Sequence, residues 1–400
     1  MNAFKRLPKF STASQRLTTP KQNSPCSALA SLPKLTYCLR TCDPSHLLPS
    51  YKQFDSLQFP TFCRLFGRPL NADARIQAFL PVKSGGVGLR SAEQPSSAEF
   101  IASNIQTRQV VNSLPVRNSP LPPQRLHTSS KVHGKCDFHV RGASTSNGKP
   151  FRLEPLHATM PAYFLFPSRM RATFDAIPSP SLGLHLDTRS FEIAMGYRLG
   201  LPLLTAGECR ATNCDQLIDA TGDHAMHCRD ASGLNGSRQD KIRDNFFEVQ
   251  HASLNPKKEM PGLVPNSQSR PADVYIGNWV DGRKMALDIS IVSPTQIPIL
   301  HRAADSAAAA IEMRKMAKNR AHFDNCRAQG ITFQPLVIET FGGWDVDAVK
   351  LLKDIARLDA RRWGKNDALE IKHFFQRLSI ALQRGNAALL INRDAEVSGF

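Results

Sequence analysis

Three cysteines and one histidine lie close together in the sequence, at Cys209, Cys214, His224 and Cys228. Thiolate sulfur and imidazole nitrogen are the ligands of structural Zn²⁺, which closes a tetrahedron of four. Soft thiolates also select zinc over magnesium. This set predicts a structural zinc knuckle without an open coordination position. His227 is an alternative ligand, but its position beside Cys228 would strain the chelate. The alternative to a metal site is a set of buried cysteines with surface histidines.

Two aspartates follow the cysteine cluster, each within a short apolar run that is typical of a strand. Asp273 lies in ADVYIG and Asp288 in MALDISIV, and residues 278–284 supply a turn between them. A carboxylate among apolar neighbours is unfavourable unless it is paired or binds a metal. Two such acids can hold Mg²⁺ or Mn²⁺, which activates water for phosphodiester hydrolysis. The alternative places Asp288 on the solvent face of an edge strand.

A third acid and a lysine would complete such a site. Glu248 and Glu259 both precede the first strand, and we prefer Glu259 because it is nearer to that strand in the sequence. A lysine two positions after the second acid would stabilise developing charge, but Ser290 stands there. Lys315 and Lys318 lie on the following helix, three residues apart and hence on one face. Either can reach the acids, and the alternative for both is a solvated basic face.

Charge and composition indicate the class of partner. The chain has 51 Lys and Arg against 34 Asp and Glu, a net charge of +17. Such an excess favours a polyanionic partner through phosphate contacts and counterion release, which predicts DNA, with RNA as an alternative. The nine scattered cysteines argue against a disulfide framework. No apolar run reaches the roughly 18 residues of a membrane span, so we expect no membrane association. The sequence does not predict an oligomeric state.

The start of the chain carries a second signal. From Met1 to Thr41 there is no acidic residue, while Lys, Arg, Ser and Thr are frequent. This composition resembles a mitochondrial transit peptide. It also fits the start of a truncated reading frame in a basic protein. We favour the second interpretation, which predicts a nuclear or cytoplasmic protein.

The elements that must position the acids and the cysteines follow from hydrophobic periodicity. Phe59, Phe62 and Phe66 indicate a helix with Pro60 near its start, and an Ala-rich helix is expected over 301–330. The order after Ser237 predicts a small mixed sheet flanked by helices. The expected fold is mixed α and β, in the following parts: a disordered basic start (1–32), a helical region (33–110), a linker with a helical segment (111–200), the zinc knuckle (201–236) and a mixed sheet flanked by helices (237–400).

These motifs together resemble the C-terminal part of the polyprotein of non-LTR retrotransposons that carry a restriction-like endonuclease. In that family a Cys-Cys-His-Cys knuckle precedes a nuclease of the PD-(D/E)xK type. Two segments match the family's motifs: Gly222-Asp223-His224 to Cys228, and Arg270 to Val274. LPKLTYCLRT and LPVKSGGVGLRS look like the thumb that follows a reverse-transcriptase palm. The resemblance covers most of residues 33–345.

The resemblance implies a DNA-nicking endonuclease with a zinc knuckle, in which Asp273, Asp288 and Lys315 or Lys318 take the family's catalytic positions. Three departures matter: the chain contains no Asp-Asp pair of a polymerase palm, RPAD is one residue longer than the simple form, and the knuckle spacing is not the commonest. We therefore expect no polymerase activity. The alternatives are an inactive nucleic-acid-binding remnant of a truncated element and a poorly folded product.

Overall fold

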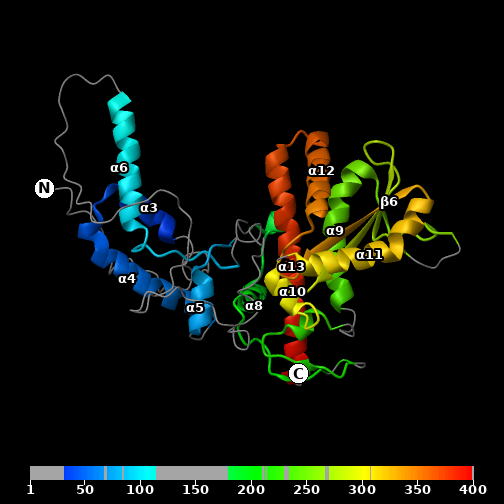
Figure 1. Ribbon diagram of the computed structural model, residues 1–400, viewed down its shortest axis with the longest axis horizontal. Helices are drawn as coiled ribbons and strands as arrows, with labels where there is room; N and C mark the ends of the chain where they lie inside the picture. The colour runs from blue at the N-terminus through cyan, green and yellow to red at the C-terminus, as the bar shows by residue number, and fades with distance from the viewer. Residues whose placement is uncertain are drawn as a thin grey trace.

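The computed structural model of the protein describes residues 31–66, 70–82, 85–113, 179–209, 211, 214–228, 234–265, 270–306 and 308–398. The start expected to be disordered, up to residue 30, and most of the expected linker, residues 114–178, lie outside these ranges. The described part combines helices with two small sheets, one of two strands and one of four. It is a mixed α and β fold (Figure 1).

The first part of the described chain is helical, as expected, with the four helices α3 (Ser31–Thr41), α4 (Pro44–Cys63), α5 (Ala72–Phe79) and α6 (Ser96–Ser113) and the short 3₁₀ turn η2 (Arg64–Phe66). Two expectations were wrong here. Residues 31 and 32 are helical, and Pro60 lies near the end of α4 rather than near the start of a helix. The helix begins much earlier, because the Asp43 carboxylate accepts the N–H of Ser45 and Pro44 fits the first turn.

Helix α8 (Thr188–Arg198) connects this helical part to the rest of the molecule. Phe59 and Phe62 of α4 pack in one apolar cluster with Met195 of α8. The buried guanidinium of Arg198 donates to the carbonyl oxygens of Gly86 and Val82, and Gln77 donates to the carbonyl oxygen of Arg198. The expected helix around Phe191, Ala194 and Tyr197 is confirmed.

The larger sheet has the strand order β3–β4–β5–β6. Its strands are β3 (Lys257–Lys258), β4 (Val274–Ile276), β5 (Lys284–Val292) and β6 (Ile331–Glu339). The first three strands are antiparallel neighbours, and β6 runs parallel to β5 over nine residue pairs. The expected turn between Asn278 and Lys284 joins β4 to β5. Strand β4 pairs with β5 over three residues only, so the second half of β5 extends past the end of β4.

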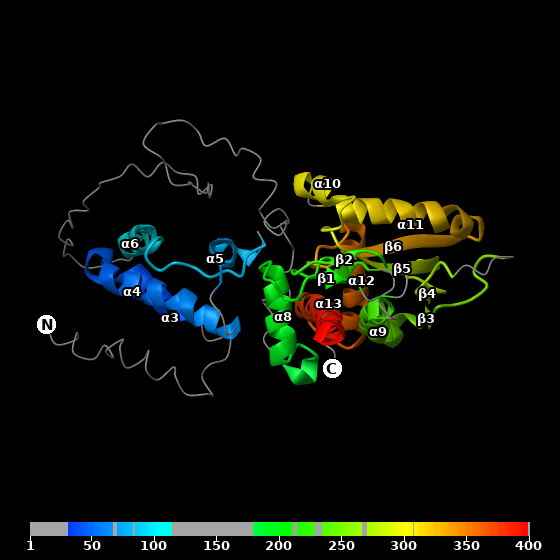
Figure 2. The same cartoon turned by 90° about the horizontal axis from the view of Figure 1, so that it is seen from below.

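Helices cover both faces of this sheet (Figures 1 and 2). Helix α11 (Ala309–Ala328) lies on one face, and α9 (Leu234–Leu254), α12 (Val346–Arg362) and α13 (Asp367–Ser398) lie on the other. Alternation along β5 directs Leu287 and Ile289 into the core shared with α9, α12 and α13. Asp288 and Ser290 consequently face α11.

The single helix expected over 301–330 is divided in the structure. Helix α10 (Leu300–Asp305) ends at Ser306, whose backbone is extended (φ −134°, ψ 114°). Helix α11 then restarts, and the N–H of Ala309 bonds to the carbonyl oxygen of Ser306. Alanine has a high helix propensity all along this segment, so composition alone gave no sign of the break.

The cysteine region forms a small unit built from the hairpin β1 (Gly207–Glu208) and β2 (Leu217–Ile218) and the 3₁₀ turn η6 (His224–Met226). Its apolar side chains do not form a separate core. Ile218 and Met226 pack in one cluster with Phe341, Leu389 and Leu390, which follow β6 or belong to α13. None of the helices in the described ranges is sufficiently long and apolar to cross a bilayer.

Candidate zinc centre and acidic site

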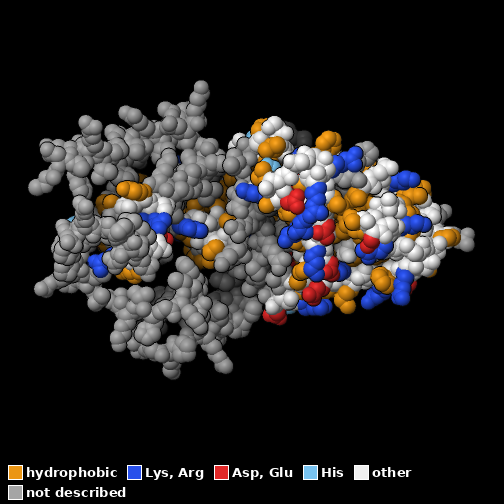
Figure 3. Space-filling view, turned by 90° about the horizontal axis from the view of Figure 1, so that it is seen from above, with side chains coloured by type: hydrophobic (Ala, Val, Ile, Leu, Met, Phe, Trp, Pro, Cys, Tyr) orange, Lys and Arg blue, Asp and Glu red, His pale blue; other side chains and the backbone are white. Residues whose placement is uncertain are grey.

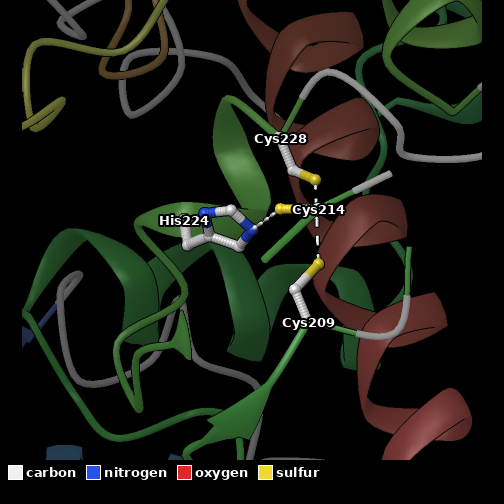
Figure 4. Close-up of side chains that lie close together, drawn as sticks. All are labelled: Cys209, Cys214, His224 and Cys228. Atoms are coloured by element: carbon white, nitrogen blue, oxygen red, sulfur yellow. Dashed lines mark hydrogen bonds between the residues drawn. The ribbon is translucent and has the colours of Figure 1, made fainter. Parts of the chain in front are cut away.

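The four predicted zinc ligands come together in the structure (Figure 4). Their ligand atoms all lie within 4.8 Å of one another. The sulfurs of Cys209 and Cys228 are 3.8 Å apart, and the sulfur of Cys214 lies 3.4 Å from Nε2 of His224. A tetrahedral zinc with Zn–S bonds of about 2.3 Å requires a sulfur–sulfur distance of about 3.8 Å. The cluster therefore fits a structural zinc ion, and its four ligands leave no open position for a substrate.

The turn that presents His224 is held by Asp219, a residue that sequence reasoning missed. The Asp219 carboxylate accepts the N–H of His224 at 2.7 Å and the N–H of Asp223 at 2.8 Å. Burial alone would raise the pKa of Asp219, but these hydrogen bonds prevail and lower it. The carboxylate therefore stays charged and fixes the backbone of the ligand loop. The signal in the sequence is an acid five residues before a ligand.

His227 contacts His224 edge to face, with ring centroids 5.5 Å apart, and does not join the ligand cluster. Burial lowers the pKa of His224, and His227 lowers it further. The neutral imidazole is the form that binds a metal. The structure thus brings His224 and not His227 to the three sulfurs.

Asp288 lies near the middle of β5 and is only 5% exposed. The ammonium of Lys318, on α11, lies 3.0 Å from its Oδ1 and 2.8 Å from its Oδ2. The geometry of a hydrogen bond is met at Oδ1, and both oxygens lie within ion-pair distance of this one ammonium. Burial raises the pKa of Asp288, and Lys318 opposes this effect. An ionised Asp288 therefore requires a cation beside it.

Asp273 lies one residue before β4, where the ladder with β5 ends. The last residue pair of the ladder is Val274 with Leu287. Beyond it, the Asp273 side chain takes the place of a backbone acceptor: its Oδ2 accepts the N–H of Ile289 at 2.6 Å. This bond brings the carboxylate beside Asp288, the residue before Ile289. Burial and then the charge of Asp288 raise the pKa of Asp273 to about 6. Two interacting carboxyl groups with raised pKa values are typical of a shared cation site.

The two candidate lysines have different partners. Lys318 binds Asp288, whereas Lys315 donates to Asp345 at 2.9 Å and to Asp347 at 2.7 Å. Asp345 is the N-cap of α12, so Lys315 joins α11 to the start of that helix. Both lysines are on one face of α11, as the spacing indicates, but only Lys318 reaches the aspartates.

Glu259, the preferred candidate for a third acid, does not place its carboxylate beside the two aspartates. The Glu259 carboxylate is 45% exposed and pairs with Arg243 and Arg270. Its backbone N–H donates to the carbonyl oxygen of Asp273 at 3.1 Å, so only the main chain of Glu259 touches the site. Glu248 belongs to α9, and its side chain lies outside the described part of the chain.

Gln239 of α9 is a site residue that sequence reasoning missed. Its Nε2 donates to Oδ2 of Asp273 at 3.2 Å. The preceding residue, Arg238, is 4% exposed and donates to the carbonyl oxygen of Met226 at 3.0 Å and to Oδ1 of Asn386 at 2.8 Å. Arg238 and Gln239 lie in a helix with many polar residues, and the sequence gives no reason to choose these two as site residues. Their contacts appear only once the chain is folded.

The acidic site therefore consists of Asp273, Asp288 and Lys318, with Gln239 behind Asp273. Oxygen ligands at such a site suit Mg²⁺ or Mn²⁺ rather than zinc. Compared with known proteins, the chain matches no protein-family model and no curated protein sequence.

Proposed function

We propose that the protein is a retroelement-derived endonuclease that nicks DNA with the help of Mg²⁺ or Mn²⁺, and that the zinc knuckle is structural. The observation that carries this proposal is the group of Asp273, Asp288 and Lys318. These residues come from the position just before β4, the middle of β5 and helix α11. The resemblance of the motifs to the nuclease of non-LTR retrotransposons supports the same activity.

The chain's own residues suit phosphodiester hydrolysis. Asp273 and Asp288 would hold the divalent ion, which when bound activates water and neutralises phosphate charge. Donors at 2.6 Å and 3.2 Å fix the orientation of the Asp273 carboxylate before any ligand arrives. The Lys318 ammonium is held in place by Asp288 and is positioned to stabilise the negative charge that develops on the phosphate.

A second candidate function has one observation in its favour. The ion pair between Lys318 and Asp288 already neutralises the buried acid without a metal ion. A protein that has lost catalysis could keep this arrangement for stability and still bind nucleic acid through its charge of +17. This is the inactive binding remnant, and the nicking experiment distinguishes it from the enzyme.

The experiment is a plasmid-nicking assay with the full chain, Mg²⁺ or Mn²⁺, and three variants. Asp288→Asn removes one metal ligand, and Lys318→Ala removes the charge that faces the phosphate. We expect each to reduce nicking by about 10²-fold or more. Lys315→Ala is the matched control, because Lys315 lies on the same helix but binds Asp345 and Asp347. It should nick at close to the wild-type rate.

Three results would count against the enzyme. Wild-type protein that binds DNA and never nicks it, with either metal, would make the chain a binding remnant. Equal losses of nicking rate in Lys315→Ala and Lys318→Ala would contradict the specific role proposed for Lys318. Nicking by Asp288→Asn at the wild-type rate would mean that the activity belongs to another site or to a contaminant.

A further inference from the structure

Two adjacent residues of α9 connect the zinc knuckle to the acidic site. Arg238 binds Met226, which lies between the zinc ligands His224 and Cys228. Gln239 binds Asp273. The activity proposed above uses the Gln239 contact to orient Asp273 but gives no role to the Arg238 contact. Because the two residues are adjacent on α9, the two contacts together link the knuckle to the Asp273 carboxylate.

Near the knuckle, several groups contact the Arg238 side chain. The Arg238 guanidinium donates to the Met226 carbonyl oxygen at 3.0 Å, to Asn386 at 2.8 Å, and lies 3.5 Å from the Met226 sulfur. Gly385 of α13 leaves room for it, because a Cβ at that position would lie 2.5 Å from Cγ of Arg238. The position of α9 is therefore set jointly by the knuckle and by α13.

The other end of this link is the carboxylate of Asp273. Only two described donors hold its Oδ2, the N–H of Ile289 and the Gln239 amide. The first belongs to the sheet, and the second moves with α9. A shift of α9 would therefore change the orientation of the carboxylate while the strands stay in place. Second-layer hydrogen bonds of this kind commonly change metal affinity by about 10- to 100-fold.

We propose that Gln239 is a positioning residue for Asp273, and that a metal-loaded knuckle sets its position through Met226 and Arg238. Zinc at the knuckle thereby strengthens the binding of the divalent ion at Asp273 and Asp288. This inference rests on the proposed metal site, and it deepens that proposal by assigning the knuckle a role in regulating it.

The test measures the affinity of the full chain for Mn²⁺ by electron paramagnetic resonance, without DNA and without turnover. Gln239→Met keeps the length of the side chain but removes the donor, and we expect a Kd for Mn²⁺ about tenfold higher or more. Asn245→Ala is the matched control on the same helix, because its amide donates to the backbone of Lys241. It should leave the Kd unchanged.

The role of the knuckle is tested by repeating the measurement after zinc is removed and the chelator is dialysed away. Zinc removal should lower the Mn²⁺ affinity of the wild type about as much as the substitution Gln239→Met does. In Gln239→Met, zinc removal should lower the affinity little further, because both changes act through the same contacts. Arg238→Lys gives the same information with zinc retained. Lysine keeps the charge but cannot bridge Met226 and Asn386 as the planar guanidinium does, so Mn²⁺ affinity should fall at an unchanged zinc content.

The outcomes separate the two proposals. If the wild type binds no Mn²⁺, the proposed metal site and this inference both fail. If the wild type binds Mn²⁺ and Gln239→Met binds it equally well, only the inference fails. Additive losses of Mn²⁺ affinity from zinc removal and from Gln239→Met would also contradict the inference. Circular dichroism of each sample shows whether the zinc-free protein keeps its helices.

Discussion

Glu339, the last residue of β6, is a buried acid that makes no ion pair with any residue in the described ranges. It is 4% exposed, and burial raises its pKa from 4.5 to about 7. The folded protein therefore holds this proton more tightly than the unfolded chain. Its contribution to stability is complete below about pH 4.5 and is lost as the pH rises towards 7.

Glu339→Gln mimics the protonated acid at every pH. We expect the variant to be more stable than the wild type at pH 8, by up to about 3 kcal/mol, and similar to it at pH 4.5. Urea unfolding at the two pH values measures the difference. Asp354→Asn is the control, because Asp354 is exposed and pairs with Arg357 on the surface. A gain from Glu339→Gln of equal size at both pH values would contradict this assignment.

At the scale of elements, the contact between the ligand loop and α13 depends on one glycine. Gly222 has a φ of +86°, and a Cβ there would lie 2.3 Å from Cδ2 of Leu390. Gly364, between α12 and α13, also has a positive φ (+62°) but has no atom within 4 Å of its Cβ position. The two sites therefore separate backbone strain from a packing clash.

Gly364→Ala should destabilise the protein by about 1 kcal/mol, the usual magnitude for a left-handed residue that gains a Cβ. Gly222→Ala should cost at least about 1–3 kcal/mol more, because Leu390 must also move in a packed core. Thermal unfolding of the zinc-loaded protein measures both. Equal losses of stability in the two variants would mean that Leu390 can move away from the new Cβ with no loss of packing energy.

Several elements could be predicted from the sequence because their signals are local. The β-branched run around Asp288 identified β5, and apolar spacing identified α8 and α9. The zinc ligands could be found because Cys and His together have few other roles at such spacing. Strand β3 was missed since its residues, Lys257 and Lys258, have no strand signal and pair only because β4 lies beside them.

The choice between Lys315 and Lys318 could not be made from the sequence. Both lie on the inner side of α11, one turn apart, and their partners come from β5 and from the start of α12. The contact depends on how far α11 is shifted along the sheet, which no local pattern records. The same holds for Gln239, whose partner is 34 residues away along the chain.

For the whole molecule, the net charge of +17 is the property that we expect to govern encounters with the proposed nucleic-acid partner. On the face shown in Figure 3, lysine and arginine side chains are spread over the C-terminal body and interleaved with acidic ones. Some basic side chains of α12 are engaged in ion pairs, such as Lys350 with Asp347 and Arg357 with Asp354. We propose that the net positive charge beyond such pairs serves phosphate binding.

DNA affinity should fall by at least about tenfold between 50 and 200 mM salt, which corresponds to two or more phosphate contacts. Asp288→Asn should show the same slope of log affinity against log salt, since that acid lies inside the protein. Fluorescence anisotropy with a labelled duplex in the presence of EDTA gives both slopes. Affinity that is independent of salt would contradict a role for the basic surface in binding.

The apolar cluster shared by the knuckle and α13 limits how this protein can be divided. A fragment that begins at Ser237 would expose Phe341, Leu389 and Leu390 to water, and it would lack Tyr197, whose ring stacks on Phe341 at 5.1 Å. We therefore expect the shortest fragment that folds by itself to start no later than α8. A product that carried the sheet without the knuckle would expose these apolar side chains, and we expect it to aggregate.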